Sequence, residues 1–353
     1  MPGMFETGCQ RPDADRLAAL RAALAACAER TIREGPWRSG AFEHLARAGV
    51  LAGFIPLDGG GTAAAEPALI ETLQAVAATC LTTALALSQW ASACRIIAGG
   101  PPLLRAARLP PLARGAAMTT VGISQLSTSR RHLGGPALAA RPDGDGWRLD
   151  GVCPWVTGAD SCGTIVTGAV DDDGTQRFFV VPTDAAGLGI GPPLPLLALS
   201  GSRTSLVTFR GVQPADVIVP DAAGGVRTGG LATTALALGA ADASVALVAQ
   251  EAVSRPALEP IVDGFEAEAG LLSARLDEAA RVGIDASARD RLRAEATSLV
   301  VRAAQAALTA SKGAGFVAGH PAERLVRESM FFLVWSCPQT VSSAVLCELA
   351  GLP

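Results

Sequence analysis

The sequence predicts an α+β fold that is mainly α, in which helical segments precede and follow a central β domain. Two observations predict this order. Apolar residues recur at helical spacing in long segments at both ends, whereas short extended runs separated by Gly, Pro and Asp turns fill the middle. With 353 residues, of which 49% are hydrophobic, the chain can bury several cores. We expect domains at 1–117, 118–220 and 221–353.

The first domain is expected to be α-helical. Residues 13–34 carry apolar side chains at helical spacing, with Asp13 or Asp15 as the N-cap and Gly35-Pro36 as the stop. A second, long helix is expected from Pro67 to about Ile97, because small and apolar residues continue without a break. The stretch "FIPLDGGG" between them lacks the Lys-Ser/Thr ending of a phosphate loop and the spacing of a dinucleotide-binding fingerprint. We therefore expect a turn there.

The middle of the chain is expected to form strands, and the last third helices. The extended runs are "WRLDGVCPWV", "GTIVTGAV", "RFFVVP", "SLVTFRGV" and "ADVIVP". After "PDAAGGVRTGG" the helical pattern returns. Its segments begin with "LATTALALGAADASVALVAQEAVS" and continue over 258–282, 286–312 and about 321–350.

Composition argues against several classes of protein. The net charge of −4 and the absence of basic runs give no electrostatic reason to bind nucleic acid. The most apolar long stretch contains Asp242, so we expect a buried helix and no membrane span. The N-terminal residues lack a signal-peptide pattern, which leads us to expect a cytoplasmic protein. The eight cysteines and three histidines show no metal-ligand spacing, so we expect reduced core thiols and no metal site.

The order of several separated motifs resembles the acyl-CoA dehydrogenase family over essentially the whole chain. The motifs are "FIPLDGGG", "GISQLSTS", "GWRLDGVCPWVTGA", "SLVTFRGVQPADVIVP" and "KGAGFVAGHPAERLVRESMFF". The resemblance implies an N-terminal helical domain, a β-barrel-like sheet domain and a C-terminal four-helix bundle. It also implies an FAD cofactor, an acyl thioester of CoA or a carrier protein as substrate, and an electron-transfer partner or flavin reductase.

In this family a glutamate removes an α proton while a β hydride passes to the flavin, so the site needs a flat apolar slot, hydrogen-bond donors and a base. By position, the resemblance implies that Trp155 packs along the flavin ring and that Thr157 offers a hydroxyl near it. Ile123 and Ser124 would donate to the pyrimidine edge. The alternative is that Trp155 is a core residue and Thr157 a turn residue.

The family usually has Gly-Ser after the flavin loop, whereas this chain reads "STSRRH". Ser129, Arg130 and Arg131 could bind a pyrophosphate or a carrier phosphate, and a solvated basic loop is the alternative. His132 is a candidate acid or base. Arg255 stands at the position of the family's cross-subunit arginine, in "RPALE".

The C-terminal segment "MFFLVWSCPQ" concentrates aromatic residues in a chain with 10 Phe, 5 Trp and no Tyr. It is either core packing or a pocket wall formed by Phe331, Phe332 and Trp335. The resemblance places it on the last long helices, over the flavin. It also aligns Ser336 with the catalytic glutamate, so a base is missing there, and Cys337 would have to be a thiolate to replace it.

A second departure from the family pattern lies at residue 233. The family's helix begins there with an arginine near the thioester, whereas this chain has a threonine. The resemblance further implies a homodimer or homotetramer, in which Arg255 and Gln339 reach a neighbour's cofactor. Three functions remain open. They are an acyl-CoA dehydrogenase-type oxidoreductase with a relocated base, a flavin-dependent monooxygenase that needs no base, and a homologue that kept the fold and lost catalysis.

Overall fold

The computed structural model describes Met4 and residues 11–127, 136–219 and 230–352. The chain divides into two compact units, each formed by separate stretches of sequence. Unit 1 consists of Met1–Ala65, Leu85–Leu196 and Ser200–Arg227. Unit 2 consists of Glu66–Ala84, Leu197–Leu199 and Thr228–Pro353. The three domains expected from the sequence remain a prediction.

Helix α1 (Ala14–Glu34) confirms the first expected helix and its caps. The Asp13 carboxylate accepts from the backbone N–H of Arg16 at 3.0 Å, which satisfies one of the N–H groups that have no partner within the helix. Gly35, at φ 95°, ends the helix. Leu20 and Leu24 are buried, as the helical spacing predicts.

The remaining helices before the sheet differ in length. They are α2 (Pro36–Ser39), α3 (Ala41–Ala48), α4 (Val50–Gly53), the 3-10 helix η1 (Leu57–Gly59), α5 (Glu66–Thr79), α6 (Leu81–Ala98) and α7 (Pro102–Ala113). The glycine-rich stretch is a turn, as expected, and a Cβ on Gly61 would lie 1.9 Å from the carbonyl oxygen of Ile55. The prediction of a single long helix from Pro67 was wrong. The segment forms two helices, α5 and α6, which are divided at Cys80, where no Gly or Pro marks the break.

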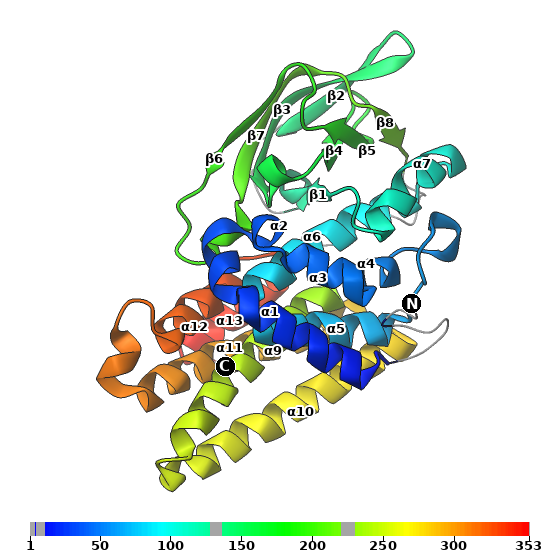
Figure 1. Ribbon diagram of the computed structural model, residues 1–353. Helices are drawn as coiled ribbons and strands as arrows, with labels where there is room; N and C mark the ends of the chain where they lie inside the picture. Colours follow the sequence, from blue (N-terminus) through cyan, green and yellow to red (C-terminus); the bar gives the residue numbers. More distant parts are fainter. Residues whose placement is uncertain (1–3, 5–10, 128–135, 220–229, 353) are drawn as a thin grey trace. The chain divides into compact units, whose positions relative to one another are not determined.

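The β domain is one eight-stranded sheet in unit 1, with the strand order β6-β7-β3-β2-β4-β5-β8 and β1 paired to β4 (Figure 1). Its strands are β1 (Thr119–Gly122), β2 (Leu138–Asp143), β3 (Gly146–Val156), β4 (Thr164–Val170), β5 (Gln176–Pro182), β6 (Leu188–Pro193), β7 (Ser205–Val212) and β8 (Asp216–Ile218). The five expected runs are all strands. Strands β1, β2 and β6 were not anticipated, and the sheet encloses a core that includes Phe179, Val181 and Phe209.

Unit 2 is helical and is organised around α9 (Leu231–Ala252), which packs against α5, α10, α11 and α12. The other helices are α10 (Glu259–Val282), α11 (Ala286–Ala310), the 3-10 helix η6 (Lys312–Phe316), α12 (Pro321–Ser329) and α13 (Gln339–Leu349). Helix α9 approaches α5 so closely that a Cβ on Gly239 would lie 2.2 Å from the carbonyl oxygen of Gln74. By length and composition α9 could cross a membrane, but 67% of its most apolar window is buried within the protein.

The prediction of one helix over 321–350 was also wrong, because the helix is interrupted between Ser329 and Gln339. Helix α12 ends at Ser329, the 3-10 helix η7 (Met330–Leu333) follows, and α13 starts only at Gln339. Pro338 cannot continue a helix from the preceding turn, and Ser336 has a φ of 47°. The aromatic segment therefore lies in the break between two helices and not on a helix face.

Candidate functional site

In unit 1 residues 122–127, which begin the "GISQLSTS" motif, are fixed to the sheet by one buried side chain. Gln125, in the short helix α8 (Ser124–Ser127), donates from Nε2 to the carbonyl oxygen of Gly168 at 2.8 Å. Its Oε1 accepts from the thiol of Cys153 at 3.0 Å. Burial raises the pKa of Cys153 to about 12, so the thiol keeps the proton that it donates. This arrangement holds the backbone of Ile123 and Ser124 against β3.

Trp155 lies in an irregular part of β3. The register with β7 shifts between Cys153 and Val156, so two residues of β3, Pro154 and Trp155, fall outside regular pairing. Such a bulge redirects a side chain, and proline can occupy it because it has no N–H to pair. The Trp155 side chain is 49% exposed. Trp155 is therefore not a core residue of unit 1.

Thr157, two residues further, is buried and points into a chain of hydroxyl groups. Its Oγ1 lies 3.1 Å from Oγ1 of Thr204, which in turn lies 2.8 Å from the hydroxyl oxygen of Ser202. The carbonyl oxygen of Thr157 accepts from the Thr120 hydroxyl at 2.7 Å. Thr157 thus has two fixed partners that the sequence did not indicate.

The turn after Thr157 depends on a glycine. Gly158 has a φ of 65°, and a Cβ there would lie 2.1 Å from the ring of Trp37. Trp37 stacks on Phe42 with ring centroids 5.6 Å apart. The residues Ser129, Arg130, Arg131 and His132, expected near a phosphate, lie outside the described part of the chain.

In unit 2 the three aromatic residues of the C-terminal segment contact one another. Phe331 stacks on Trp335 with centroids 5.0 Å apart and planes 17° apart, and Phe332 packs edge-on to both rings. Phe332 is fully buried, whereas Phe331 and Trp335 are half-buried. Core packing therefore accounts for Phe332, while the other two present ring surface outward.

Arg293 is a residue that sequence reasoning missed. It lies in α11, is 1% exposed, and donates from Nη1 to the carbonyl oxygen of Thr233 at 2.9 Å. Its Nη2 reaches the carbonyl oxygens of Phe332 and Trp335 at 3.5 and 3.4 Å. Its recorded partners in the described part of the chain are neutral, and burial lowers its pKa to about 10.

Arg293 connects two positions that the sequence singled out separately. One is the first turn of α9, at Thr233, and the other is the break that contains Ser336 and Cys337. The signal that could have revealed it is an arginine on the same α11 face as the buried Ala296, Thr297 and Val300. A cation in an apolar stripe is uncommon because burial of a charge is costly.

Cys337 is half-buried beside Arg293. Burial raises the pKa of its thiol, the charge of Arg293 opposes this rise, and Asp290 adds to it. Asp290 lies one turn before Arg293 on α11 and accepts from the hydroxyl of Thr340 at 2.5 Å. It is a carboxylate close to this segment that the sequence did not suggest.

Arg255 and Gln339, expected at a subunit boundary, have partners within unit 2. Arg255 donates to the carboxylate of Glu251 and to the carbonyl oxygen of Ala310 at 2.5 Å. Gln339 is exposed at the start of α13 and donates to the hydroxyl of Ser343 at 3.4 Å.

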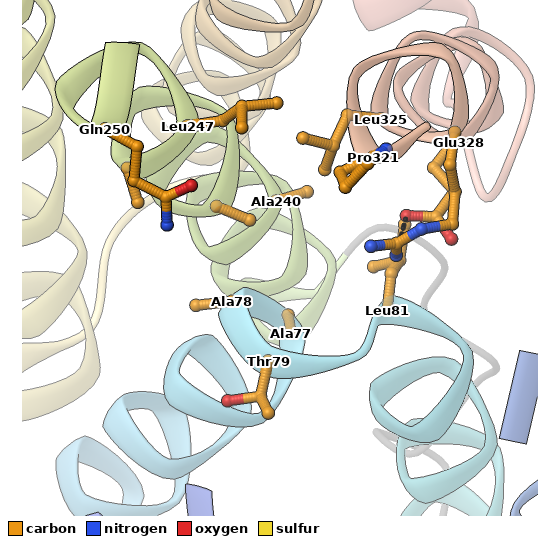
Figure 2. A pocket seen from close by; sticks show the side chains of 13 residues that line it. Ala77, Ala78, Thr79, Leu81, Ala240, Leu247, Gln250, Pro321, Leu325 and Glu328 are labelled. Carbon is orange, nitrogen blue, oxygen red and sulfur yellow. Dashed lines mark hydrogen bonds and ion pairs between the residues drawn. The ribbon is translucent and has the colours of Figure 1, made fainter. Parts of the chain in front are cut away.

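Unit 2 also contains a pocket of about 270 Å³ between the end of α5, the middle of α9 and α12 (Figure 2). Its lining is mostly Ala and Leu side chains, and Glu328 and Arg324 of α12 supply its charged groups. Glu328 is 3% exposed.

The fold and the sequence both relate the chain to one family. No profile of a known family matches it. It is 25% identical over 298 residues to the probable acyl-CoA dehydrogenase YngJ of Bacillus subtilis, covering 77% of this chain and 78% of that protein. It is also 25% identical over 286 residues to the probable acyl-CoA dehydrogenase FadE25 of Mycobacterium tuberculosis, covering 71% of each.

Solved structures share the fold over nearly the full length. A glutaryl-CoA dehydrogenase from Mycobacterium smegmatis, in complex with FADH2, superimposes with a TM-score of 0.79 at 20% identity, covering 96% of this chain and 95% of that one. FkbI, described for biosynthesis of a methoxymalonyl extender unit, superimposes with a TM-score of 0.78 at 19% identity, covering 96% of this chain and 100% of that one. KijD3, in complex with FMN and a dTDP-amino-keto sugar, superimposes with a TM-score of 0.75 at 22% identity, covering 96% of this chain and 93% of that one.

These relationships confirm two predictions. The fold is α+β and mainly α, with a central sheet and C-terminal helices. In sequence and in fold the chain is similar to acyl-CoA dehydrogenases, as its motifs indicated.

Proposed function

We propose that the chain is a flavin-dependent oxidoreductase that binds FAD and oxidises an acyl thioester, or a related substrate, with a base other than a carboxylate at residue 336. The observation that carries this proposal is the exposed indole of Trp155 on the β3 bulge. A large flat apolar group held outward on a rigid strand suits one wall of a flavin slot.

The residues around Trp155 fit such a cofactor. The loop at Ile123 and Ser124 is anchored by Gln125, so its backbone groups are held in place for hydrogen bonding to a ring edge. The hydroxyl of Thr157 belongs to a buried chain that fixes its direction. When bound, a flavin supplies the hydride acceptor. The residues of this chain would orient the ring and exclude water from one of its faces.

The reaction needs a base that residues 330–340 do not supply. Oxidation of a thioester at the α and β carbons requires a base for the α proton. The Ser336 hydroxyl is not a base at neutral pH, and burial raises the pKa of the Cys337 thiol, which keeps it protonated. Residues 330–340 contain no Asp or Glu. A base from elsewhere is therefore part of the proposal, and Asp290, which accepts from the hydroxyl of Thr340 just after this segment, is our candidate.

A second candidate is a flavin-dependent monooxygenase, for which this base is dispensable. Its support is the segment itself, because the ring surfaces of Phe331 and Trp335 offer an apolar wall where the family is expected to have its glutamate. KijD3 and FkbI share the fold, which is consistent with both candidates.

The resemblance to acyl-CoA dehydrogenases also supports proposals about the assembly and the partners of this chain. We infer a cytoplasmic homodimer or homotetramer in which Arg255 and Gln339 lie near a neighbour's cofactor, with an electron-transfer protein or a flavin reductase as partner. Sedimentation equilibrium tests the assembly, and a monomer at micromolar concentration would contradict it.

The absorbance spectrum of the purified protein is the first test. Flavin bands at roughly one FAD per chain are expected, whereas failure to bind added FAD would exclude both enzyme functions and leave a homologue without catalysis. Anaerobic addition of acyl-CoA and acyl-carrier thioesters should then bleach the bands of a dehydrogenase. Unbleached flavin, together with oxygenated product once a reductase and oxygen are present, would support the monooxygenase instead.

A further inference from the structure

The pocket in unit 2 is a separate feature from the aromatic segment. It opens where α5 ends at Thr79, and its opposite walls are α9 and α12. In Figure 2 the side chain of Glu328 extends toward Leu81 from α12, while Ala240 and Leu247 face the space from α9. Its volume of about 270 Å³ is below the usual range for drug-sized ligands, so it suits a small molecule.

Glu328 has fewer partners than a buried carboxylate needs. The group is 3% exposed, and its recorded contact in the described part of the chain is with Nη1 of Arg324, at a long 3.4 Å. Arg324 is partly exposed and reaches Glu328 from one turn earlier on the same helix. A carboxylate can accept about four hydrogen bonds, so this one long contact leaves most of its capacity unused. Burial raises the pKa of Glu328, and the charge of Arg324 opposes that rise.

The last turn of α5 and the first residue of α6, Leu81, meet the same space. The carbonyl groups of the last turn of a helix lack partners within the helix and carry partial negative charge. The last turn of α5 contributes Ala77, Ala78 and Thr79 to the pocket lining. The thiol of Cys80, which follows, is fully buried, and burial raises its pKa, so it stays uncharged.

From this geometry we propose that the pocket binds a small primary ammonium ligand, with its cationic group at Glu328 and the end of α5 and a short aliphatic body between α9 and α12. The ammonium group has three donors and so supplies the hydrogen bonds that Glu328 lacks. Ala240, Leu247 and Leu325 provide apolar contact for the body. The pocket volume equals that of about nine water molecules in the liquid. The ligand can therefore have on the order of ten non-hydrogen atoms.

The inference is independent of the proposed oxidoreductase activity, because that proposal uses none of the pocket residues and the test needs neither flavin nor turnover. The probes are n-butylammonium chloride, 1-butanol and sodium butyrate, which share one carbon skeleton. They are titrated calorimetrically into the full chain, with sodium chloride at equal ionic strength as the blank. We expect n-butylammonium to bind at one site per chain, and the alcohol and the carboxylate to bind at least about tenfold more weakly.

Matched variants locate the site. Glu328→Gln keeps the shape and removes the charge, so the dissociation constant for n-butylammonium should rise at least about tenfold. Glu323→Gln makes the same change on the same helix, at a carboxylate that pairs with Arg327 at 2.7 Å outside the pocket lining, and binding should be unchanged. Ala243→Leu fills the pocket from α9 and should abolish binding even if Glu328→Gln fails to fold.

Three results would overturn the proposal. They are no binding of n-butylammonium above the sodium chloride blank, equal or tighter binding of butyrate, and binding that survives in Ala243→Leu.

Discussion

Nη1 of Arg293 in α11 donates to the carbonyl oxygen of Thr233 in the first turn of α9 at 2.9 Å. A fully buried cation is thus held by an uncharged partner, and its second terminal nitrogen reaches the carbonyls of Phe332 and Trp335. The guanidinium carbon also lies 5.3 Å from the centroid of the Phe332 ring. These contacts connect α9, α11 and the break after α12, and they make Arg293 the organising residue of this part of unit 2.

The charge on Arg293 makes stability depend on alkaline pH. Burial lowers its pKa to about 10 in the folded chain from 12.5. Between pH 10 and 12.5 the unfolded chain holds the proton of Arg293 that the folded chain has lost. The free energy of unfolding should therefore rise with pH. We expect the wild type to gain about 1 kcal/mol relative to Arg293→Met between pH 9 and 11. Urea unfolding of both proteins measures this difference.

Both proteins in that comparison should carry Cys337→Ala, because the charge of Arg293 acts on the pKa of this thiol. At pH 7 the Arg293→Met variant should still be less stable, by about 1–3 kcal/mol, since the carbonyls of Thr233, Phe332 and Trp335 lose a donor. A difference that stays constant from pH 9 to 11 would contradict the lowered pKa.

The reactivity of Cys337 should depend on Arg293. The arginine charge opposes the rise in the pKa of this thiol, so its removal should raise the pKa further and reduce the thiolate fraction. Iodoacetamide should therefore alkylate Cys337 roughly threefold to tenfold more slowly at pH 8.5 in Arg293→Met. Peptide mass spectrometry gives the rate, with the half-buried Cys347 as the internal reference. Faster alkylation would mean that Arg293 mainly shields the thiol.

Gly158 should tolerate no side chain. A Cβ would lie 2.1 Å from the Trp37 ring, and the φ of 65° is unfavourable for other residues. Gly158→Ala should lower the free energy of unfolding by at least about 3 kcal/mol. Gly144 has a similar φ of 58° with nothing within 4 Å of the added atom. The control Gly144→Ala should therefore cost only about 1 kcal/mol, and equal costs would show that the ring contact is unimportant.

Two tryptophans on β3 separate cofactor binding from stability. Trp155 is exposed, whereas Trp147 packs edge-on to Phe179 with centroids 5.8 Å apart and carries Arg177 over its ring. If Trp155 contacts a flavin, Trp155→Ala should weaken FAD binding at least about tenfold and change stability by less than about 1 kcal/mol.

Trp147→Ala should do the reverse, with FAD affinity unchanged and a loss of about 2–3 kcal/mol in stability. Fluorescence titration with FAD and urea unfolding measure the two quantities. Unchanged FAD binding in Trp155→Ala would remove the observation on which the proposed function depends.

The predictions from sequence succeeded where the signal is local. Asp13 and Gly35 fixed the ends of α1, and the five apolar runs between turn residues became strands. The prediction of one helix from Pro67 failed, because no local residue marks the break at Cys80. The bulge that exposes Trp155 was not predicted, because it depends on the register with β7.

The sequence by itself determined the order of helices, sheet and helices and the family resemblance, because periodicity, caps and motif order are properties of neighbouring residues. Only the tertiary structure revealed Arg293, whose partners lie 39 to 60 positions away in the chain. The same holds for Glu328, which the sequence presents as a helix residue beside Arg327. Burial and the contacts between helices place its carboxylate at the pocket, and these are set by long-range packing that no local pattern encodes.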